Sequence, residues 1–204
     1  MLPDSESAPS TPHDPESPQA QTPDQGPTDA EVLDILQSAF EAARNGDAAF
    51  LAQWLERGLP PNLQNTRGDT LLMLAAYHSH TGAVRTLLDH GADPNILNDQ
   101  GQTPLMGAVF RGDQTTAELL VERGAGLDVA APGGRTALMM AAMFGRTEML
   151  DWLIELGADL HVRDAGGATA ADAARVMGAA DTAARLDALL AQSPAPAFRP
   201  TKED

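Results

Sequence analysis

Residues 67–97 read RGDTLLMLAAYHSHTGAVRTLLDHGADPNIL, and this stretch indicates the fold. Thr70 can cap a helix whose apolar face includes Leu72 and Leu74. Two small alanines follow in the same helix and allow close packing against a neighbour. The helix must be short, because Ser-His-Thr-Gly at 79–82 breaks its apolar pattern.

A second helix is predicted after this break. Val84, Leu87 and Leu88 stand at i, i+3 and i+4, which places them on one helical face. Gly91 suits the left-handed position that ends a helix, and turn-forming Asp, Pro, Asn and Gly dominate 92–101. The stretch therefore predicts two short antiparallel helices and a projecting turn, a unit that buries its apolar face only when copies of it stack.

The unit is repeated along the chain with a period of 33 residues. The repeated positions form columns of Gly, Thr and Ala, and one column of Trp and Leu. The columns are Gly58, Gly91, Gly124 and Gly157; Gly68, Gly101, Gly134 and Gly167; Thr70, Thr103, Thr136 and Thr169; Ala75, Ala108, Ala141 and Ala174; and Trp54, Leu87, Leu120, Leu153 and Leu186. A fixed period of about 20–50 residues is typical of a solenoid.

These residues resemble the ankyrin-repeat pattern. Its Thr-Pro-Leu is present at 103–105, and its Leu-Leu-x-x-Gly-Ala-Asp-Pro-Asn is present at 87–95. The resemblance covers about residues 32–190. It implies an all-α solenoid in which each unit has an inner helix, an outer helix and a β-hairpin loop that projects toward the concave side. Within the family, the chain is similar to small bacterial single-domain ankyrin proteins, some of which accompany catalases in oxidative-stress protection.

We expect about five helix-turn-helix units in one domain of residues 28–190. Their predicted boundaries are 28–64, 65–97, 98–130, 131–163 and 164–190. The first unit opens with the capping box Thr28-Asp29-Ala30-Glu31. Its long helix is expected to direct apolar side chains inward, namely Val32, Leu36, Phe40 and Ala43. The last unit is more polar, since Ala171 and Asp172 replace a Leu-Met pair, and a polar face suits the end of a stack.

Both terminal segments lack the apolar residues of a folded domain. Residues 1–27 contain seven prolines and five carboxylates but no Lys, Arg or aromatic residue, so we predict a disordered acidic tail. This tail either solvates the protein or recognises a basic partner. Residues 191–204 are predicted to form a second, short disordered tail, in which only Phe198 could dock on the domain.

The net charge of −16 comes from 29 acidic and 13 basic residues. An acidic chain lacks the basic surface that nucleic acid or an anionic membrane requires, so neither is an expected partner. The absence of Cys excludes disulfides and thiolate chemistry. No apolar run approaches the roughly 20 residues that span a bilayer, and no secretory signal is present, so we expect a cytoplasmic protein.

The sequence contains no pattern typical of an enzyme or a metal protein. G-x-S-x-G, the P-loop and H-E-x-x-H are all absent, and His78 and His80 do not share a helical face. The glycine-rich residues 131–134 fall at a repeat turn and open no strand-helix phosphate site. We therefore expect a non-catalytic protein with no cofactor and no metal.

Methionine occupies the place at which the ankyrin pattern usually has histidine. Met73, Met106 and Met139 hold this position in the middle units, and Asp172 holds it in the last. The family's histidine ties the loop to the neighbouring unit by hydrogen bonds, which a thioether cannot make in the same way. Two hypotheses remain open: the thioethers fill space between units, or they form a column sensitive to oxidation.

The ankyrin pattern implies exposed positions at the end of each inner helix and at the loop tips. The pairs at the helix ends are Arg44-Asn45, Tyr77-His78, Phe110-Arg111, Met143-Phe144 and Val176-Met177. Tyr77, Phe110 and Phe144 recur every 33 to 34 residues, so stacked units would align them as one stripe on the concave surface. Aromatic, Met and Arg side chains are enriched at interfaces. In the alternative interpretation, Phe110 and Phe144 cover the loop between units.

We predict a non-catalytic protein-protein interaction module, a monomer that binds a partner protein on its concave face. The predicted partner-binding residues at helix ends are Tyr77, His78, Phe110, Arg111, Met143 and Phe144. Those at the loop tips are Arg67, Asp69, Gln100, Gln102 and Arg135. The alternative function is an accessory role in oxidative-stress protection, in which the chain supports a redox enzyme such as catalase.

Overall fold

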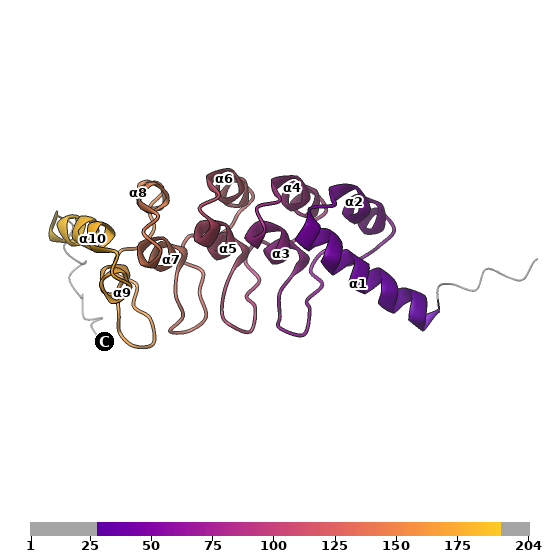
Figure 1. Ribbon diagram of the computed structural model, residues 1–204, viewed down its shortest axis with the longest axis horizontal. Coiled ribbons are helices and arrows are strands. Elements are labelled where there is room, and N and C mark those ends of the chain that lie inside the picture. The colour runs from indigo at the N-terminus through magenta and orange to yellow at the C-terminus, as the bar shows by residue number, and fades with distance from the viewer. Residues whose placement is uncertain (1–27, 193–204) are drawn as a thin grey trace, which may run out of the picture.

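A computed structural model describes residues 28–192, which form five stacked pairs of antiparallel helices (Figure 1). The inner row contains α1 (Asp29–Asn45), α3 (Leu71–Tyr77), α5 (Pro104–Arg111), α7 (Ala137–Met143) and α9 (Ala170–Val176). The outer row contains α2 (Ala48–Glu56), α4 (Thr81–Asp89), α6 (Gln114–Glu122), α8 (Thr147–Glu155) and α10 (Ala180–Gln192). The predicted all-α solenoid is thereby confirmed. The segments 1–27 and 193–204, predicted to be tails, lie outside the described residues.

The threonine column begins the inner helices after the first. Thr70 Oγ1 accepts a hydrogen bond from the Met73 amide at 3.1 Å, and Thr103 Oγ1 accepts one from the Met106 amide at 3.3 Å. The same bond recurs in α7 and α9. These threonines are buried, so each cap satisfies polar groups that water cannot reach. The repeated threonine therefore fixes where each inner helix starts.

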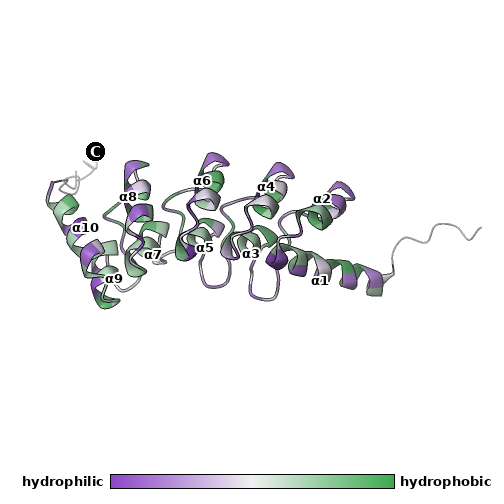
Figure 2. Ribbon diagram, turned by 45° about the horizontal axis from the view of Figure 1, so that its top comes forward, coloured by the Kyte–Doolittle hydropathy of each residue, from purple (hydrophilic) through white to green (hydrophobic). Residues whose placement is uncertain are grey.

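The core lies between the two rows of helices and runs the length of the stack. Its largest side chains are leucines at the repeated positions; Leu87, Leu105, Leu120 and Leu153 are all 0% exposed. Small alanines line the contacts between successive inner helices, which allows them to pack closely. Figure 2 shows the inner helices α3, α5 and α7 largely apolar and the outward edges of α2, α4, α6 and α8 polar. Each unit thus buries its apolar face against the next one.

The two ends of the stack differ from the sequence-based expectation. The Thr28–Glu31 capping box is present, but Val32 was wrongly predicted to point inward and is 38% exposed. The first turns of α1 run beyond its neighbour α3 (Figure 1), and Val32 belongs to the first turn of α1. At the other end, α10 continues to Gln192, two residues into the segment predicted as a tail.

The loops between units project to one side of the stack, beside the inner helices (Figure 1). They are turns closed by backbone hydrogen bonds rather than the pairs of strands that the family pattern implied. The amides of Asn65, Asn98 and Asp164 each donate to the carbonyl four residues later, at 3.0 Å. Between residues 28 and 192 the only β-bridge is the isolated one that joins Gln64 to Thr70.

Candidate binding groove

Three aromatic rings from successive units touch one another at the ends of the inner helices. Tyr77 stacks on Phe110, with ring centroids 5.5 Å apart and planes inclined by 8°. Phe110 meets Phe144 edge to face, with centroids 4.7 Å apart. Tyr77 and Phe144 remain 42% and 37% exposed, whereas Phe110 is half-buried against the core. We call these three residues the aromatic row.

The repeat explains why the row is continuous. Tyr77 ends α3, Phe110 is the next-to-last residue of α5, and Phe144 follows directly after α7. Because the inner helices stack side by side, equivalent ends come into contact across units. Val176 and Met177 hold the next positions and are 85% and 51% exposed, but they are not part of the groove lining described below.

The aromatic row lies in a groove of about 930 Å³ between the inner helices and the projecting loops. Ten of the eleven residues predicted to contact a partner line this groove, and the exposed Arg111 lies outside the lining. The lining runs from Arg44 in the first unit to Gly166 in the last. The groove therefore crosses all five units.

Sequence reasoning missed several residues of the groove lining, among them Met140 and Gly107. Met140 lines it, although its position in the repeat did not suggest exposure. Gly107 holds the equivalent position one unit earlier, between Leu74 and Met140 in the stack. It adds no side chain there, which leaves room beside Tyr77. Comparing the sizes of the residues at this repeat position could have identified Gly107 from the sequence. A glycine inside a helix is unfavourable without a packing reason, so it marks a special environment.

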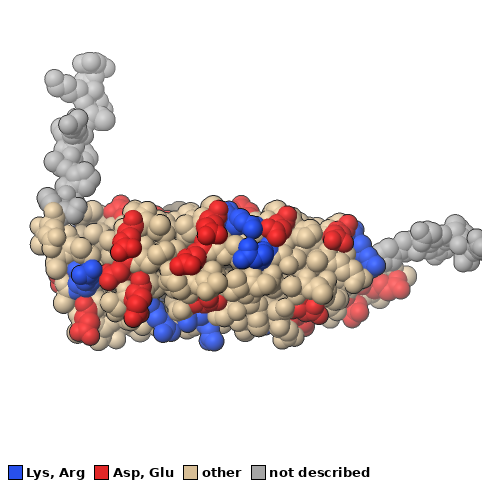
Figure 3. Space-filling view, turned by 90° about the horizontal axis from the view of Figure 1, so that it is seen from above, with Lys and Arg blue, Asp and Glu red and all other residues tan. Residues whose placement is uncertain are grey.

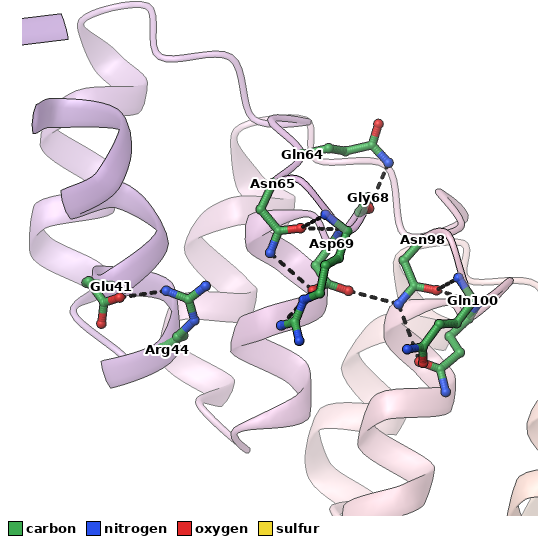
Figure 4. Close-up of polar contacts among 10 residues, drawn as sticks. Glu41, Arg44, Gln64, Asn65, Gly68, Asp69, Asn98 and Gln100 are labelled. Carbon is green, nitrogen blue, oxygen red and sulfur yellow. Dashed lines mark hydrogen bonds and ion pairs between the residues drawn. The ribbon is translucent and has the colours of Figure 1, made fainter. Parts of the chain in front are cut away.

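The structure places Asp69 differently from the prediction that it would be exposed. The residue is 7% exposed, and its carboxylate accepts from Asn65 Nδ2 at 3.1 Å and from Asn98 Nδ2 at 2.8 Å (Figure 4). Arg67 pairs with the same carboxylate at 3.2 Å. Asp69 thus joins the first loop to the second. Asp69 also belongs to the groove lining, so its predicted contact with a partner stays a prediction.

The third loop lacks this polar support. Asn65 and Asn98 each use Oδ1 to accept two backbone amides of their own loop, but Ala131 holds the equivalent position in the third. The loop instead turns at Pro132-Gly133, the pair favoured in a type II turn, with a φ of 69° at Gly133. Arg135 follows this turn and lines the groove.

The groove lining carries as many arginines as aspartates, although the chain is acidic overall; they are Arg44, Arg67 and Arg135, and Asp69, Asp99 and Asp164. The pKa of His78 is lowered, first by partial loss of hydration and then by repulsion from His80, Arg111 and Arg44. Of these, Arg44 has an acidic partner, Glu41, at 2.6 Å. The opposite, outer face carries acidic side chains over most of its length with fewer arginines (Figure 3). The groove is therefore the less acidic side of the protein.

The methionine column is almost fully buried, although Met73 and Met106 belong to the groove lining. Met73, Met106 and Met139 are 5%, 2% and 1% exposed. This burial fits the hypothesis that the thioethers fill space between units. In the described part of the chain, no group of three or more His, Asp or Glu side chains is placed to hold a metal ion. No helix within 28–192 is long and apolar enough to cross a membrane.

Comparison with known proteins agrees with this geometry. Family profiles described as "Ankyrin repeats (3 copies)" and "Ankyrin repeats (many copies)" match residues 39–131 and 120–174. An ankyrin repeat protein of Pseudomonas aeruginosa is 49% identical over 57 residues, which are 28% of this chain. The match spans only 33% of that relative. The chain belongs to the ankyrin-repeat family, whose members are generally protein-protein interaction modules and are typically non-catalytic.

Proposed function

We propose that the chain binds an extended segment of a partner protein in the groove, with the aromatic row as its main anchor. The observation that carries this proposal is the contact geometry of the row. Three rings from successive units contact one another, one pair stacked and one pair edge to face, and two of the rings belong to residues that remain more than a third exposed. A fixed, partly exposed aromatic surface loses little conformational entropy when a partner covers it, which is why such residues dominate interface energetics.

The shape of the groove favours an elongated ligand. Its lining comes from all five units, so a ligand that contacts them all must run along the stack. The loop tips provide polar groups of the lining, including Gln100, Gln102 and Arg135. An interface with an apolar centre and a polar rim is the usual anatomy of protein-protein recognition.

Affinity purification from the native cell, followed by mass spectrometry, tests this function. The bait is the full chain, compared with a variant that carries Tyr77→Ala and Phe144→Ala. The matched control is Leu156→Ala, because Leu156 is 45% exposed at the end of an outer helix and does not line the groove.

We expect one or more proteins to be captured by the full chain and by Leu156→Ala, and to be lost with the double variant. A redox enzyme such as catalase among them would single out the accessory role in oxidative-stress protection. Capture that is equal for all three baits would contradict binding through the aromatic row.

A further inference from the structure

The projecting tips of the four loops between units are not joined equally. In order along the chain, the tips are residues 65–69, 98–102, 131–135 and 164–168. The first two tips are joined by two hydrogen bonds. The Asp99 amide donates to the Arg67 carbonyl at 3.1 Å, and Asn98 Nδ2 donates to the Asp69 carboxylate at 2.8 Å (Figure 4). These bonds hold the first and second tips side by side.

The third tip cannot form either bond with the second. Pro132 holds the repeat position of Asp99 and has no amide hydrogen to donate. Ala131 holds the position of Asn98 and has no polar side chain. Within residues 28–192, no hydrogen bond joins the second tip to the third. The two tips still touch, because a Cβ atom at Gly101 would lie 2.9 Å from that of Ala131.

The third and fourth tips are joined again. The Ala165 amide donates to the Gly133 carbonyl at 2.5 Å, which repeats the backbone bond between the first and second tips. Ala165 holds the same repeat position as Pro132, so the proline accounts for the bond that is missing one unit earlier. The row of tips is thus divided into two joined pairs. We call the boundary between the second and third tips the seam.

The bases of the loops are joined along the whole stack, including across the seam. There Asn95 Oδ1 accepts from the Gly126 amide at 2.8 Å, and its Nδ2 donates to the Gly124 carbonyl at 3.0 Å. Bonds at the equivalent place join the other neighbouring loops. The inner helix α5 also packs less extensively on α7 than on α3. Because parts with few tertiary bonds open at low cost in free energy, the tips can separate at the seam while the bases act as a hinge.

The seam lies in the wall of the groove. Gln100 and Gln102 line the groove on one side of it, and Gly133 and Arg135 line it on the other. Arg135 is exposed and forms no ion pair in the part of the chain that the structure describes. No ion pair of Arg135 therefore holds the third tip in place.

We propose that the groove wall opens at the seam, with the first and second tips on one side and the third and fourth on the other, and that this opening admits the partner segment. The proposal rests on the proposed function, because it takes the groove as the binding face. It adds that Ala131 and Pro132 determine where the wall opens.

Pairs of nitroxide labels on the full chain measure the opening. The chain contains no Cys, so two introduced cysteines are its only labelling sites. Gln102→Cys with Arg135→Cys spans the seam, and Arg135→Cys with Ala168→Cys spans the joined third and fourth tips. These three positions are equivalent in the repeat, so a wall without a seam would separate both pairs by the same spacing of about 8–10 Å.

The magnetic coupling between two labels broadens the electron paramagnetic resonance spectrum and falls steeply with their distance. We expect the broadening across the seam to be at least about twofold weaker than that between the third and fourth tips, because the open wall separates the first pair. Equal broadening in the two pairs would overturn the proposal.

Substitutions in the tips make the test specific. Ala131→Asn with Pro132→Ala gives the third tip the Asn of the second and the Ala of the fourth, and it should raise the broadening across the seam to that of the other pair. Ala165→Pro removes the amide that joins the third and fourth tips, and it should weaken the broadening of that pair alone. All three positions lie outside the helices, and circular dichroism checks that the stack is intact. Broadening that neither variant changes would show that these hydrogen bonds do not control the wall, and the proposal would fail.

Partner capture separates this proposal from the proposed function. In a short incubation, the bait with Ala131→Asn and Pro132→Ala should capture at most about a third as much partner as the unmodified chain, because a wall held closed slows entry. Capture that needs Tyr77 and Phe144 but is unchanged by this bait contradicts only the role of the opening. Weaker broadening across the seam, with capture that ignores the aromatic row, supports the opening and contradicts the proposed function.

Discussion

The first and last turns of the inner helices are built from opposite kinds of residue. The first turns repeat almost unchanged: a capping threonine, then a leucine and a methionine that are at most 5% exposed in α3, α5 and α7. The last turns vary from Tyr77 to Phe110, Phe144 and Val176, and three of these four are 37% to 85% exposed. Each of these helices has only seven or eight residues. Its first turn packs in the core of the stack, and its last turn carries side chains on the surface.

This difference shows what repetition means in such a chain. A residue that recurs every 33 positions meets the same neighbours in each unit, so packing restricts its type. A residue that changes from unit to unit has no such restriction and is available for recognition. Substitutions at repeated positions should therefore affect stability more than substitutions at variable ones.

The largest effect is expected at a repeated position. Leu105→Ala should lower the free energy of unfolding by about 2–5 kcal/mol, because Leu105 is 0% exposed and the change leaves a cavity. Tyr77→Ala, at the variable end, should cost at most about 1 kcal/mol, since the ring is 42% exposed. Urea unfolding measures both. Similar losses for the two variants would break the comparison.

The next effect concerns a loop residue that varies and is nevertheless buried. Asp69→Ala should cost about 1–3 kcal/mol, because it leaves the amides of Asn65 and Asn98 without their acceptor. Gln100→Ala, at an exposed tip of the same groove, is the control and should be close to neutral. If denaturant unfolding shows no difference between them, the link between the first two loops is not stabilising.

Methionines at the two ends of the inner helices should differ in reactivity. Met73, Met106 and Met139 are buried, while Met177 is 51% exposed at a helix end. Mild peroxide followed by peptide mapping should therefore oxidise Met177 at least about tenfold faster than the buried three. Oxidation of the buried three at the same rate as Met177 in the folded protein would instead favour an oxidation-sensitive column.

A smaller, stabilising effect is expected at Asp128, which stands where the preceding unit has Asn95. Asn95 Oδ1 accepts from the Gly126 amide at 2.8 Å and its Nδ2 donates to the Gly124 carbonyl at 3.0 Å. Asp128, one unit later, accepts from the Asp159 amide at 3.1 Å but has no donor. Asp128→Asn should raise stability by about 0.5–1 kcal/mol at neutral pH, through the added hydrogen bond.

The pH dependence of this variant follows from the pKa of Asp128. Partial loss of hydration raises that pKa, and the Asp159 charge adds to the rise, although the bond from the Asp159 amide opposes it. A raised pKa in the folded state means that ionisation disfavours folding, so the native carboxylate destabilises the protein as the pH rises through it. The advantage of Asn should therefore shrink as the pH falls through the raised pKa toward the ordinary value of 3.8, and should change little below it. An advantage that grows on acidification would contradict this assignment.

The sequence predicted the helices and the aromatic row but not the loops. Periodicity placed the caps and core leucines, because each depends on local spacing and on neighbours of the same type. It failed at Val32, where the stack ends and the expected neighbour is missing. It also failed at Asp69, whose burial depends on Asn65 and Asn98, and the amide of Asn98 reaches it from the following loop. Contacts between unlike residues of different units leave no periodic signal.

The most direct test of the central claim measures folding and partner capture on the same variant. Tyr77→Ala with Phe144→Ala should keep the helical circular dichroism and the cooperative unfolding of the unmodified chain, yet lose the captured partner that Leu156→Ala retains. A double variant that folds and still captures the same partner would contradict recognition through the aromatic row.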